Sequence, residues 1–336
     1  MIIVMHPDAS DVEIAGVVEK LRALGAEVRV SQELGRTVLE GSVETLLQTE
    51  SPWESYPGVD RVVPQIRGGR RVGREFRSED TVVRVGSVEI GGEQIVMVAG
   101  PCAVESREQM LAAARAVAAA GAHIMRGDAF KPRTSPYTFQ GLGKAGLEIL
   151  AEARQVTGLP FVAEVIDPRD VELVSSYADM LRIGTRNMAN YPLLREVGRQ
   201  ERPVLLKRGR GATVEEWVDA AEYIHSEGNP NIVLVERGVR GFDSSARNTL
   251  DITAVPVAQS LTHLPVMVDP SHASGRKDLV APLARAAVAV GADGVLVDVH
   301  PTPETALVDG AQALLPEEFA ALVEELRAVA SAVGRS

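Results

Sequence analysis

The unit that decides the fold begins at residues 95–121, "IVMVAGPCAVESREQMLAAARAVAAAG". A short apolar run ends at Gly-Pro-Cys, and alanine, leucine and valine then recur at helical spacing, which predicts a strand followed by an amphipathic helix. The later strand-like runs are "HIMRGDAF", "PFVAEVID", "DMLRIGTRN", "PVLLKRG", "NIVLVERG", "PVMVDPSH" and "GVLVDVHP". Eight such units over roughly 240 residues predict an α/β protein with a (β/α)8 TIM barrel. A doubly wound open sheet is the alternative, but no G-x-G-x-x-G follows the first strand.

Residues 1–70 predict a smaller domain before the barrel. Strands and helices alternate there as βαββαβ, the order of a ferredoxin-like fold. Ser10 or Asp11 is expected to cap the first helix, and a second helix is expected at residues 43–50. Residues 71–94 are interpreted as a charged, glycine-bearing linker with a hairpin, and residues 95–336 as the barrel.

The composition indicates a soluble, acidic protein. A formal net charge of -11 argues against binding to nucleic acids or anionic membranes, which need a basic surface. The single cysteine excludes an intrachain disulfide and favours a reducing compartment. The N-terminus lacks the features of a signal peptide, and charges interrupt the apolar stretch 281–299. We therefore expect a cytoplasmic protein.

Reactive or charged residues stand at the end of each predicted barrel strand, where the active sites of such barrels lie. In strand order they are Cys102, Arg126, Glu164, Arg186, Lys207, Arg237, His272, and Asp298 with His300. A purely structural pattern would place solvated charges at both ends of the strands alike. This register therefore predicts an active site at one mouth of the barrel.

Cations dominate this set. The stretch 127–141, "GDAFKPRTSPYTFQG", adds Lys131 and Arg133 directly after Arg126. Too many cations gather here for neutralisation by Glu164 alone, and buried like charges repel one another, so a multiply charged anion is expected among them. Arginine matches phosphate and carboxylate with two parallel hydrogen bonds. The pattern predicts a small phosphorylated and carboxylated substrate, with a salt-bridged surface as the alternative.

Four residues form a second set at the same mouth: Cys102, His272, Asp298 and Asp309. A thiolate, an imidazole and carboxylates suit a divalent cation such as zinc, iron or manganese. Their spacing follows no short consensus, and a lone cysteine is also commonly a small buried apolar residue. From the residues alone, both interpretations stay open.

Seven motifs carry a resemblance to a known family. They are "GPCAVES", "RGDAFKPRTSPYTFQGLG", "GTRNMANY", "LLKRG", "ERGVRGFDSSARNTLD", "VDPSHASGRKDL" and "DVHPTPETALVDG". In this order they resemble 3-deoxy-D-arabino-heptulosonate 7-phosphate (DAHP) synthase, in the short subgroup with an N-terminal ferredoxin-like domain. The related 3-deoxy-manno-octulosonate 8-phosphate synthases carry an asparagine in the lysine-containing loop, where this chain has "KPRTS".

The resemblance implies that phosphoenolpyruvate, erythrose 4-phosphate and water give DAHP and phosphate, at the entry of the shikimate pathway. Phosphoenolpyruvate would be held by Arg126, Lys131, Arg186, Lys207 and Arg237, and erythrose 4-phosphate by Pro132, Arg133, Thr134 and Ser135. One divalent ion (Mn, Fe, Zn or Co) would be held by Cys102, His272, Asp298 and Asp309. The family usually has Glu where this chain has Asp298, whose shorter arm reaches less far.

The implied catalytic residues are Lys131, Glu164 and His272. Lys131 is expected to donate a proton to the nascent alkoxide, and Glu164 to orient the water or stabilise positive charge at C2. The resemblance further implies a homotetramer and feedback regulation, with tyrosine or phenylalanine bound at the N-terminal domain.

The same residues also suit two other functions. One is a Schiff-base aldolase with Lys207 or Lys131 as nucleophile. The other is a noncatalytic sensor of sugar phosphates, which would not need metal-type residues beside the anion site.

Overall fold

The computed structural model describes residues 2–33, 35–41, 53–63 and 70–336. The chain folds as two compact units, Met1–Ser78 and Glu79–Ser336. The second unit therefore begins inside the segment 71–94 that the sequence assigns to a linker and hairpin. No helix among the described residues is both long and apolar enough to cross a membrane.

The first unit contains an antiparallel sheet. Its described elements are β1 (Ile2–Met5), α1 (Asp11–Ala23), β2 (Val28–Glu33), β3 (Arg36–Gly41), the short 3-10 helix η1 (Trp53–Ser55) and β4 (Val59–Val63). The strand order is β2-β3-β1-β4, with antiparallel pairing throughout, as a ferredoxin-like fold requires. The predicted helix at residues 43–50 lies outside the described residues.

Helix α1 begins at the predicted cap. The Ser10 hydroxyl accepts a hydrogen bond from the backbone N–H of Glu13, and the Glu13 carboxylate accepts one from the backbone N–H of Ser10 (2.8 Å). This reciprocal arrangement satisfies two donors that a helix start leaves unpaired. The apolar face of α1 then packs on the sheet through Leu21, in a core that also contains Ile3, Met5, Leu39 and Trp53.

A hairpin opens the second unit, formed by β5 (Val83–Val85) and β6 (Val88–Ile90). Val83, Val85 and Ile90 are fully buried in one core cluster with residues near the start of the barrel strands, including Val96. Each such burial contributes about 2 kcal/mol of apolar transfer free energy. The hairpin therefore closes the amino-terminal end of the barrel and leaves the other end open for a site.

Eight parallel strands close the barrel within residues 79–336, all of which the structure describes. The strands are β7 (Val96–Gly100), β8 (Ile124–Arg126), β9 (Phe161–Glu164), β10 (Met180–Ile183), β11 (Val204–Lys207), β12 (Ile232–Glu236), β13 (Val266–Val268) and β14 (Gly294–Asp298). Their apolar, β-branched residues are buried on both faces, as a parallel barrel demands. The predicted (β/α)8 barrel is confirmed.

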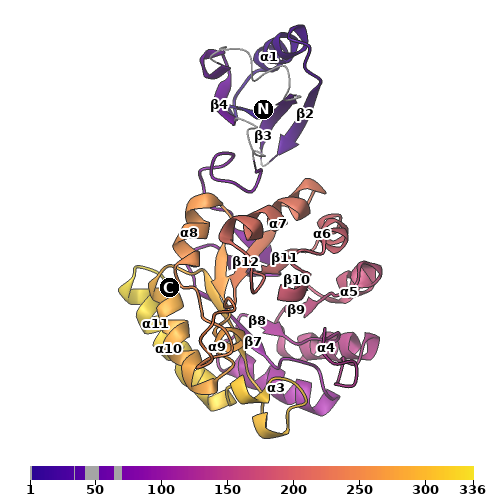
Figure 1. Ribbon diagram of the computed structural model, residues 1–336, viewed down its shortest axis with the longest axis vertical. Helices are drawn as coiled ribbons and strands as arrows, with labels where there is room; N and C mark the ends of the chain where they lie inside the picture. The colour runs from indigo at the N-terminus through magenta and orange to yellow at the C-terminus, as the bar shows by residue number, and fades with distance from the viewer. Residues whose placement is uncertain (1, 34, 42–52, 64–69) are drawn as a thin grey trace. The chain divides into compact units, whose positions relative to one another are not determined.

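Helices surround the strands, as Figure 1 shows. They are α3 (Arg107–Ala119), α4 (Lys144–Thr157), α5 (Val171–Tyr177), α6 (Tyr191–Gly198), α7 (Val214–Ser226), α8 (Ala254–Leu261), α10 (Lys277–Ala289) and α11 (Pro316–Ala332). The five-residue α9 (Pro270–Ser274) is different, because it lies in the connection between β13 and α10. That connection carries His272 to the open end of the barrel.

Gly100, the last residue of β7, brings two strand ends close together. Its φ is +148°, and a Cβ built there would lie 2.2 Å from the carbonyl oxygen of Arg126. Only glycine allows this approach, which places the turn that carries Cys102 directly beside the end of β8.

Candidate active site

The structure places the predicted residues at the carboxyl ends of the strands. Arg126, Glu164, Lys207 and Asp298 are the last residues of β8, β9, β11 and β14. Cys102 follows β7, Arg186 lies in the 3-10 helix η3 (Thr185–Asn187) after β10, Arg237 follows β12, and His272 lies in α9. Because each of these residues stands at or just after the end of a strand, the closed barrel brings their side chains together at one mouth.

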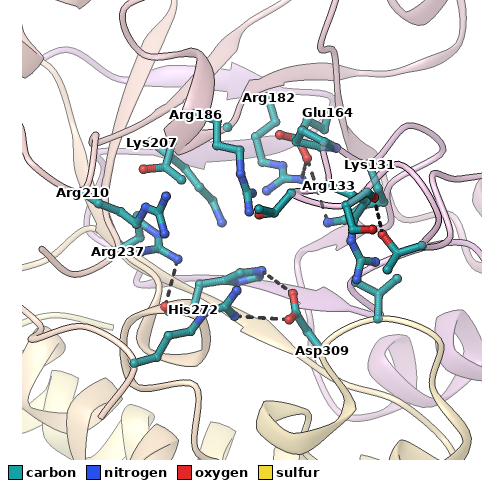
Figure 2. Close-up of a pocket in the computed structure, with 18 residues that line it drawn as sticks. Lys131, Arg133, Glu164, Arg182, Arg186, Lys207, Arg210, Arg237, His272 and Asp309 are labelled. Atoms are coloured by element: carbon teal, nitrogen blue, oxygen red, sulfur yellow. Dashed lines mark hydrogen bonds and ion pairs between the residues drawn. The ribbon is translucent and has the colours of Figure 1, made fainter. Parts of the chain in front are cut away.

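A pocket of about 270 Å³ opens at this mouth (Figure 2). The predicted residues that line it are Lys131, Pro132, Arg133, Thr134, Ser135, Glu164, Arg186, Lys207, Arg237, His272 and Asp309. Cys102, Arg126 and Asp298 are buried and are not part of the lining. His300 is also buried, with its Nε2 3.6 Å from Glu105 Oε2.

Carboxylates pair with the deepest cations. The guanidinium of Arg126 lies between Asp298 and Asp128, with Nη2 2.9 Å from Asp128 Oδ2. Lys131 Nζ donates to the same Asp128 oxygen at 2.7 Å and lies 4.0 Å from Glu164 Oε2. Glu164 is therefore not the sole carboxylate beside these cations, because a second layer of carboxylates lies behind the pocket wall.

Glu164 is fixed by the neighbouring strand. Arg182, in the body of β10, donates to Glu164 Oε2 at 2.8 Å. Gly184 follows β10, and a Cβ there would lie 1.9 Å from Glu164 Oε1. Glycine at this position therefore leaves room for the carboxylate to face the pocket.

Lys207 is buried and paired with Asp269. Burial disfavours its charged form and lowers the pKa of Lys207 to about 8, although Asp269 opposes this effect. Asp269 also accepts a hydrogen bond from the backbone N–H of His272 at 2.8 Å. One carboxylate thus connects the ammonium of Lys207 with the helical turn that presents His272.

Besides Arg133, three arginines supply uncompensated positive charge to the pocket. Among the described residues, no carboxylate forms an ion pair with Arg186, Arg210 or Arg237, and all three line the pocket (Figure 2). Burial lowers the pKa of Arg237 to about 10, and burial together with Arg186 lowers the pKa of Arg210. An anion bound among these arginines would stabilise their charged forms and raise both pKa values. The positive charge expected of the predicted anion site therefore lies here.

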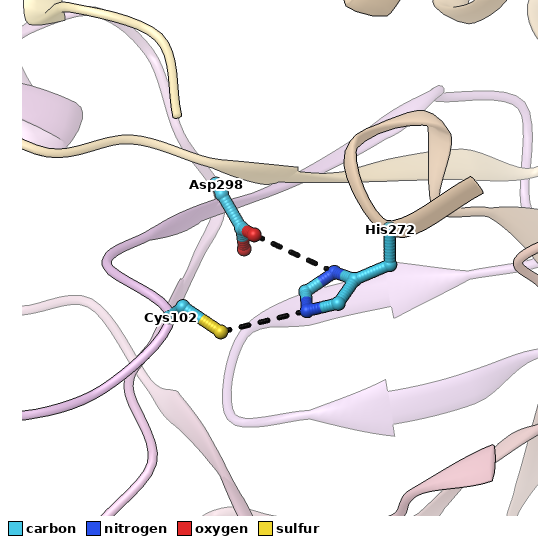
Figure 3. Close-up of side chains that lie close together, drawn as sticks. All are labelled: Cys102, His272 and Asp298. Carbon is cyan, nitrogen blue, oxygen red and sulfur yellow. Dashed lines mark hydrogen bonds and ion pairs between the residues drawn. The ribbon is translucent and has the colours of Figure 1, made fainter. Parts of the chain in front are cut away.

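The metal-type residues lie together. Cys102, His272 and Asp298 each offer a ligand atom within 4.8 Å of the others (Figure 3). Cys102 Sγ is 3.5 Å from His272 Nε2 and 3.2 Å from Asp309 Oδ2, and His272 Nε2 is 3.6 Å from Asp309 Oδ2. The four predicted ligands therefore come from the end of β14 and from the connections that follow β7, β13 and β14.

The triangle formed by Cys102, His272 and Asp309 fits a single ion. Metal–ligand bonds of about 2.0–2.3 Å at tetrahedral angles place neighbouring donor atoms roughly 3.3–3.7 Å apart. The separations of 3.5 and 3.6 Å fall in this range, and the 3.2 Å between Cys102 Sγ and Asp309 Oδ2 lies just below it. The other ring nitrogen, Nδ1, lies 2.9 Å from Asp269 Oδ2, the arrangement in which a carboxylate orients a ligating imidazole. Asp309 adopts a left-handed backbone conformation, with a φ of 54°, that aims it at the triangle.

Asp298 lies on the other side of the imidazole, with Oδ2 3.5 Å from His272 Nδ1. Its two oxygens are already engaged, one by Arg126 and the other by Gln312 Nε2 at 2.6 Å. The short side chain therefore belongs to the cluster but does not face the common point of the other three donors.

Sequence reasoning missed Asp128, Arg182, Asp269 and Arg210. Arg182 was detectable as a charge inside the apolar strand "MLRIG", since a charged residue in a buried strand needs a partner. Asp128 and Asp269 stand in loops near Lys131 and His272, and nothing in their local pattern separates them from turn residues.

The fold and this mouth define a (β/α)8-barrel enzyme with an anion pocket beside a thiol–imidazole–carboxylate cluster. The sequence model of the DAHP synthetase I family matches residues 77–332, and that of the DAHP synthase ferredoxin-like domain matches residues 1–65. A phospho-2-dehydro-3-deoxyheptonate aldolase of Thermotoga maritima is 45% identical, with 99% of each chain covered. A 2-dehydro-3-deoxyphosphooctonate aldolase of Syntrophotalea carbinolica is 33% identical, with 74% of this chain and 95% of the relative covered.

Two solved structures support the same family assignment. The crystal structure of the Thermotoga maritima DAHP synthase matches with a TM-score of 0.79 and 44% identity, over 100% of this chain and 98% of the other. A truncated form of that protein matches with a TM-score of 0.74 and 47% identity, over 79% of this chain and 97% of its own. The chain belongs to the DAHP synthase family. The resemblance drawn from the motifs is confirmed, and with it the prediction of a 3-deoxy-7-phosphoheptulonate synthase, a transferase.

Proposed function

We propose that the pocket joins phosphoenolpyruvate to erythrose 4-phosphate, with the two substrates side by side between the arginines and the "KPRTS" loop. The observation that carries this proposal is the juxtaposition of uncompensated arginines with a metal-type cluster, one member of which, Cys102, has its Sγ 3.2 Å from Lys131 Nζ. One part of the mouth attracts phosphate and carboxylate, and the other part suits the polarisation of an aldehyde.

Phosphoenolpyruvate takes the arginine side. Arg186 and Arg237 hold its phosphate together with Lys207, and Lys131 meets its carboxylate. Arg126 belongs to the same predicted set, but its guanidinium is paired with Asp128 and Asp298 behind the lining. Direct contact between Arg126 and substrate would require the release of one of these carboxylates.

Erythrose 4-phosphate takes the side formed by Pro132, Arg133, Thr134 and Ser135, all of which line the pocket. Arg133 Nη1 donates to the carbonyl of Phe139 at 3.3 Å, and no ion pair involves this arginine among the described residues. Its charge is therefore available for the phosphate of the aldose.

Cys102, His272, Asp309 and Asp298 would hold one divalent ion, of which Mn, Fe, Zn and Co are the candidates. When bound, the ion supplies Lewis-acid polarisation of the aldehyde carbonyl. His272 is kept in place by Asp269, which fixes the ring so that Nε2 is directed at the thiol of Cys102.

The remaining chemistry falls to the side chains. C3 of phosphoenolpyruvate bonds to the aldehyde carbon, and Lys131 gives a proton to the resulting alkoxide. Burial lowers the pKa of Lys131, but Asp128, Cys102 and Glu164 together outweigh it and raise this pKa above its usual value, so the side chain carries the proton. Water adds at C2, oriented by Glu164, and the C2–O bond to phosphate then breaks. Arg186 and Arg237 stabilise the departing phosphate.

One specific observation favours the alternative of a Schiff-base aldolase. Lys207, with a pKa of about 8, is a better amine nucleophile than an ordinary lysine. Borohydride added during turnover would trap a covalent adduct on Lys207 in a Schiff-base enzyme, and it leaves the protein unmodified under the proposed reaction. Release of phosphate from phosphoenolpyruvate, dependent on erythrose 4-phosphate, separates the proposal from a noncatalytic sensor.

The first unit has a regulatory role in this proposal. A ferredoxin-like domain beside a pathway-entry enzyme suits the binding of a small effector, for which tyrosine or phenylalanine is proposed. We further place the protein in the cytoplasm as a homotetramer.

A further inference from the structure

A crowded ion-pair network in the second unit surrounds Asp128, a residue that touches neither substrate nor metal in the proposed reaction. Asp128 follows β8 by two residues, and its side chain is 1% exposed. One oxygen, Oδ2, receives Arg126, Lys131 and Arg182, while Oδ1 accepts from the backbone N–H of Glu164 at 3.3 Å. These cations outweigh the effect of burial and hold the pKa of Asp128 well below its usual range.

Arg182 is the partner that makes this network possible. It stands within β10 with only 3% of its surface exposed, and its Nη2 contacts both Asp128 Oδ2 and Glu164 Oε2. A guanidinium inside a barrel strand is unfavourable without partners, because burial removes its water. The two carboxylates provide that compensation.

The buried charges balance. Three cations, Arg126, Lys131 and Arg182, face three carboxylates, Asp128, Glu164 and Asp298. Removal of Asp128 alone would leave an excess positive charge, and removal of Arg182 alone an excess negative charge. Removal of both would restore the balance.

Lys131 is the member that faces substrate. Its Nζ donates to the carbonyl oxygen of Cys102 at 3.1 Å and lies 3.2 Å from Cys102 Sγ, at the junction where the pocket meets the metal-type cluster. A small displacement of the ammonium group would remove it from this junction. We propose that Asp128 and Arg182 are positioning residues: their ion pair holds Lys131 at this junction and sets the net charge of the pocket floor. The inference rests on the proposed roles of Lys131 and the pocket.

The test is a double-mutant cycle of Asp128→Asn, Arg182→Gln and both together, assayed by phosphate release at varied phosphoenolpyruvate. Asp128→Asn is expected to lower kcat about tenfold or more without raising the KM for phosphoenolpyruvate, because the floor gains positive charge while Lys131 loses its anchor. Arg182→Gln is expected to raise this KM about tenfold, because the floor becomes negative. The double variant should bring this KM back to within about threefold of the parent value because the charge balance returns, while kcat stays low because Lys131 still lacks Asp128.

Different effects on KM, followed by recovery, cannot arise from general loss of structure. Asp179→Asn is the matched control, because Asp179 pairs with Arg154 (2.8 Å) at the other end of β10. It is expected to alter the melting temperature and leave both kinetic constants unchanged. Additive losses in the double variant, with folded protein by circular dichroism, would overturn the inference. An inactive parent would instead reject the proposed function itself.

Discussion

Cys102 and His272 are 170 residues apart in the sequence, yet Cys102 Sγ lies 3.5 Å from His272 Nε2. They meet because both follow strands of one closed barrel, so that the order of strands brings the first and seventh connections to the same mouth. A thiol, an imidazole and a carboxylate are thereby brought into one small triangle, and all three are donor types that a divalent cation binds.

Cys102→Ser is expected to abolish most of the activity, by about two orders of magnitude or more. A hydroxyl stays protonated at neutral pH and is a poor ligand for the soft borderline ions that a thiolate holds. Metal content after dialysis, measured by elemental analysis, should fall in parallel with the rate. A variant that retained its metal while losing activity would show that the thiol has another task.

Asp298→Glu is expected to tighten metal binding about tenfold. The oxygens of Asp298 are held by Arg126 and Gln312, and one more methylene would carry a carboxylate towards the point shared by Cys102, His272 and Asp309. Competition with a fluorescent chelator measures this change directly. Weaker binding by this variant than by the parent would mean that Asp298 already has the better geometry.

Arg133→Ala is expected to raise the KM for erythrose 4-phosphate about tenfold and to leave that for phosphoenolpyruvate nearly unchanged. Binding of a phosphate that is remote from the reacting carbons contributes equally to the ground and transition states, so kcat should change little. Steady-state kinetics with each substrate varied in turn provides the measurement. A larger effect on phosphoenolpyruvate would place Arg133 on the other substrate.

Affinity for phosphoenolpyruvate should fall as pH rises through about 8. Burial lowers the pKa of Lys207 to about 8, so the free enzyme carries this charge below that pH and loses it above. A bound anion favours the ammonium form, so kcat/KM should decline at a lower pH than kcat. Profiles from pH 6 to about 10 that showed the same alkaline limit for both constants would argue against Lys207 as an anion ligand.

A protein that starts at Glu79 should keep the synthase reaction and lose inhibition by tyrosine or phenylalanine. Glu79–Ser336 is a compact unit by itself and contains every residue of the pocket. Initial rates of the full-length and shortened proteins against each amino acid decide the matter. If both were inhibited equally, the effector site would lie in the barrel.

Much of this organisation is predictable from sequence because strand ends and periodicity are local signals. Cys102, Glu164 and Lys207 each close an apolar run, and a barrel then requires them to converge. The pairing among charges is not local. Asp128 reaches Arg182 across 54 positions, and only the register of β8, β9 and β10 decides that this carboxylate faces that strand.

For the same reason, the sequence could not predict which cations pair with carboxylates and which are available for substrate. Arg126 and Arg237 look alike in sequence, each at a strand end, but they differ in their partners. Arg126 is paired with Asp128 and Asp298, while Arg237, among the described residues, donates hydrogen bonds to the carbonyl oxygens of Gly238 and His272 alone. Which arginine is available for substrate depends on acidic residues from other strands, and no spacing rule relates them.

We propose that this mouth condenses phosphoenolpyruvate with erythrose 4-phosphate by means of a bound divalent ion. The most direct test is phosphate release from phosphoenolpyruvate in the presence of erythrose 4-phosphate or arabinose 5-phosphate, before and after chelation. We expect rapid release with erythrose 4-phosphate, much slower release with arabinose 5-phosphate, loss of both after EDTA, and recovery when a divalent ion is restored. Full turnover in metal-free protein, or a preference for arabinose 5-phosphate, would contradict it.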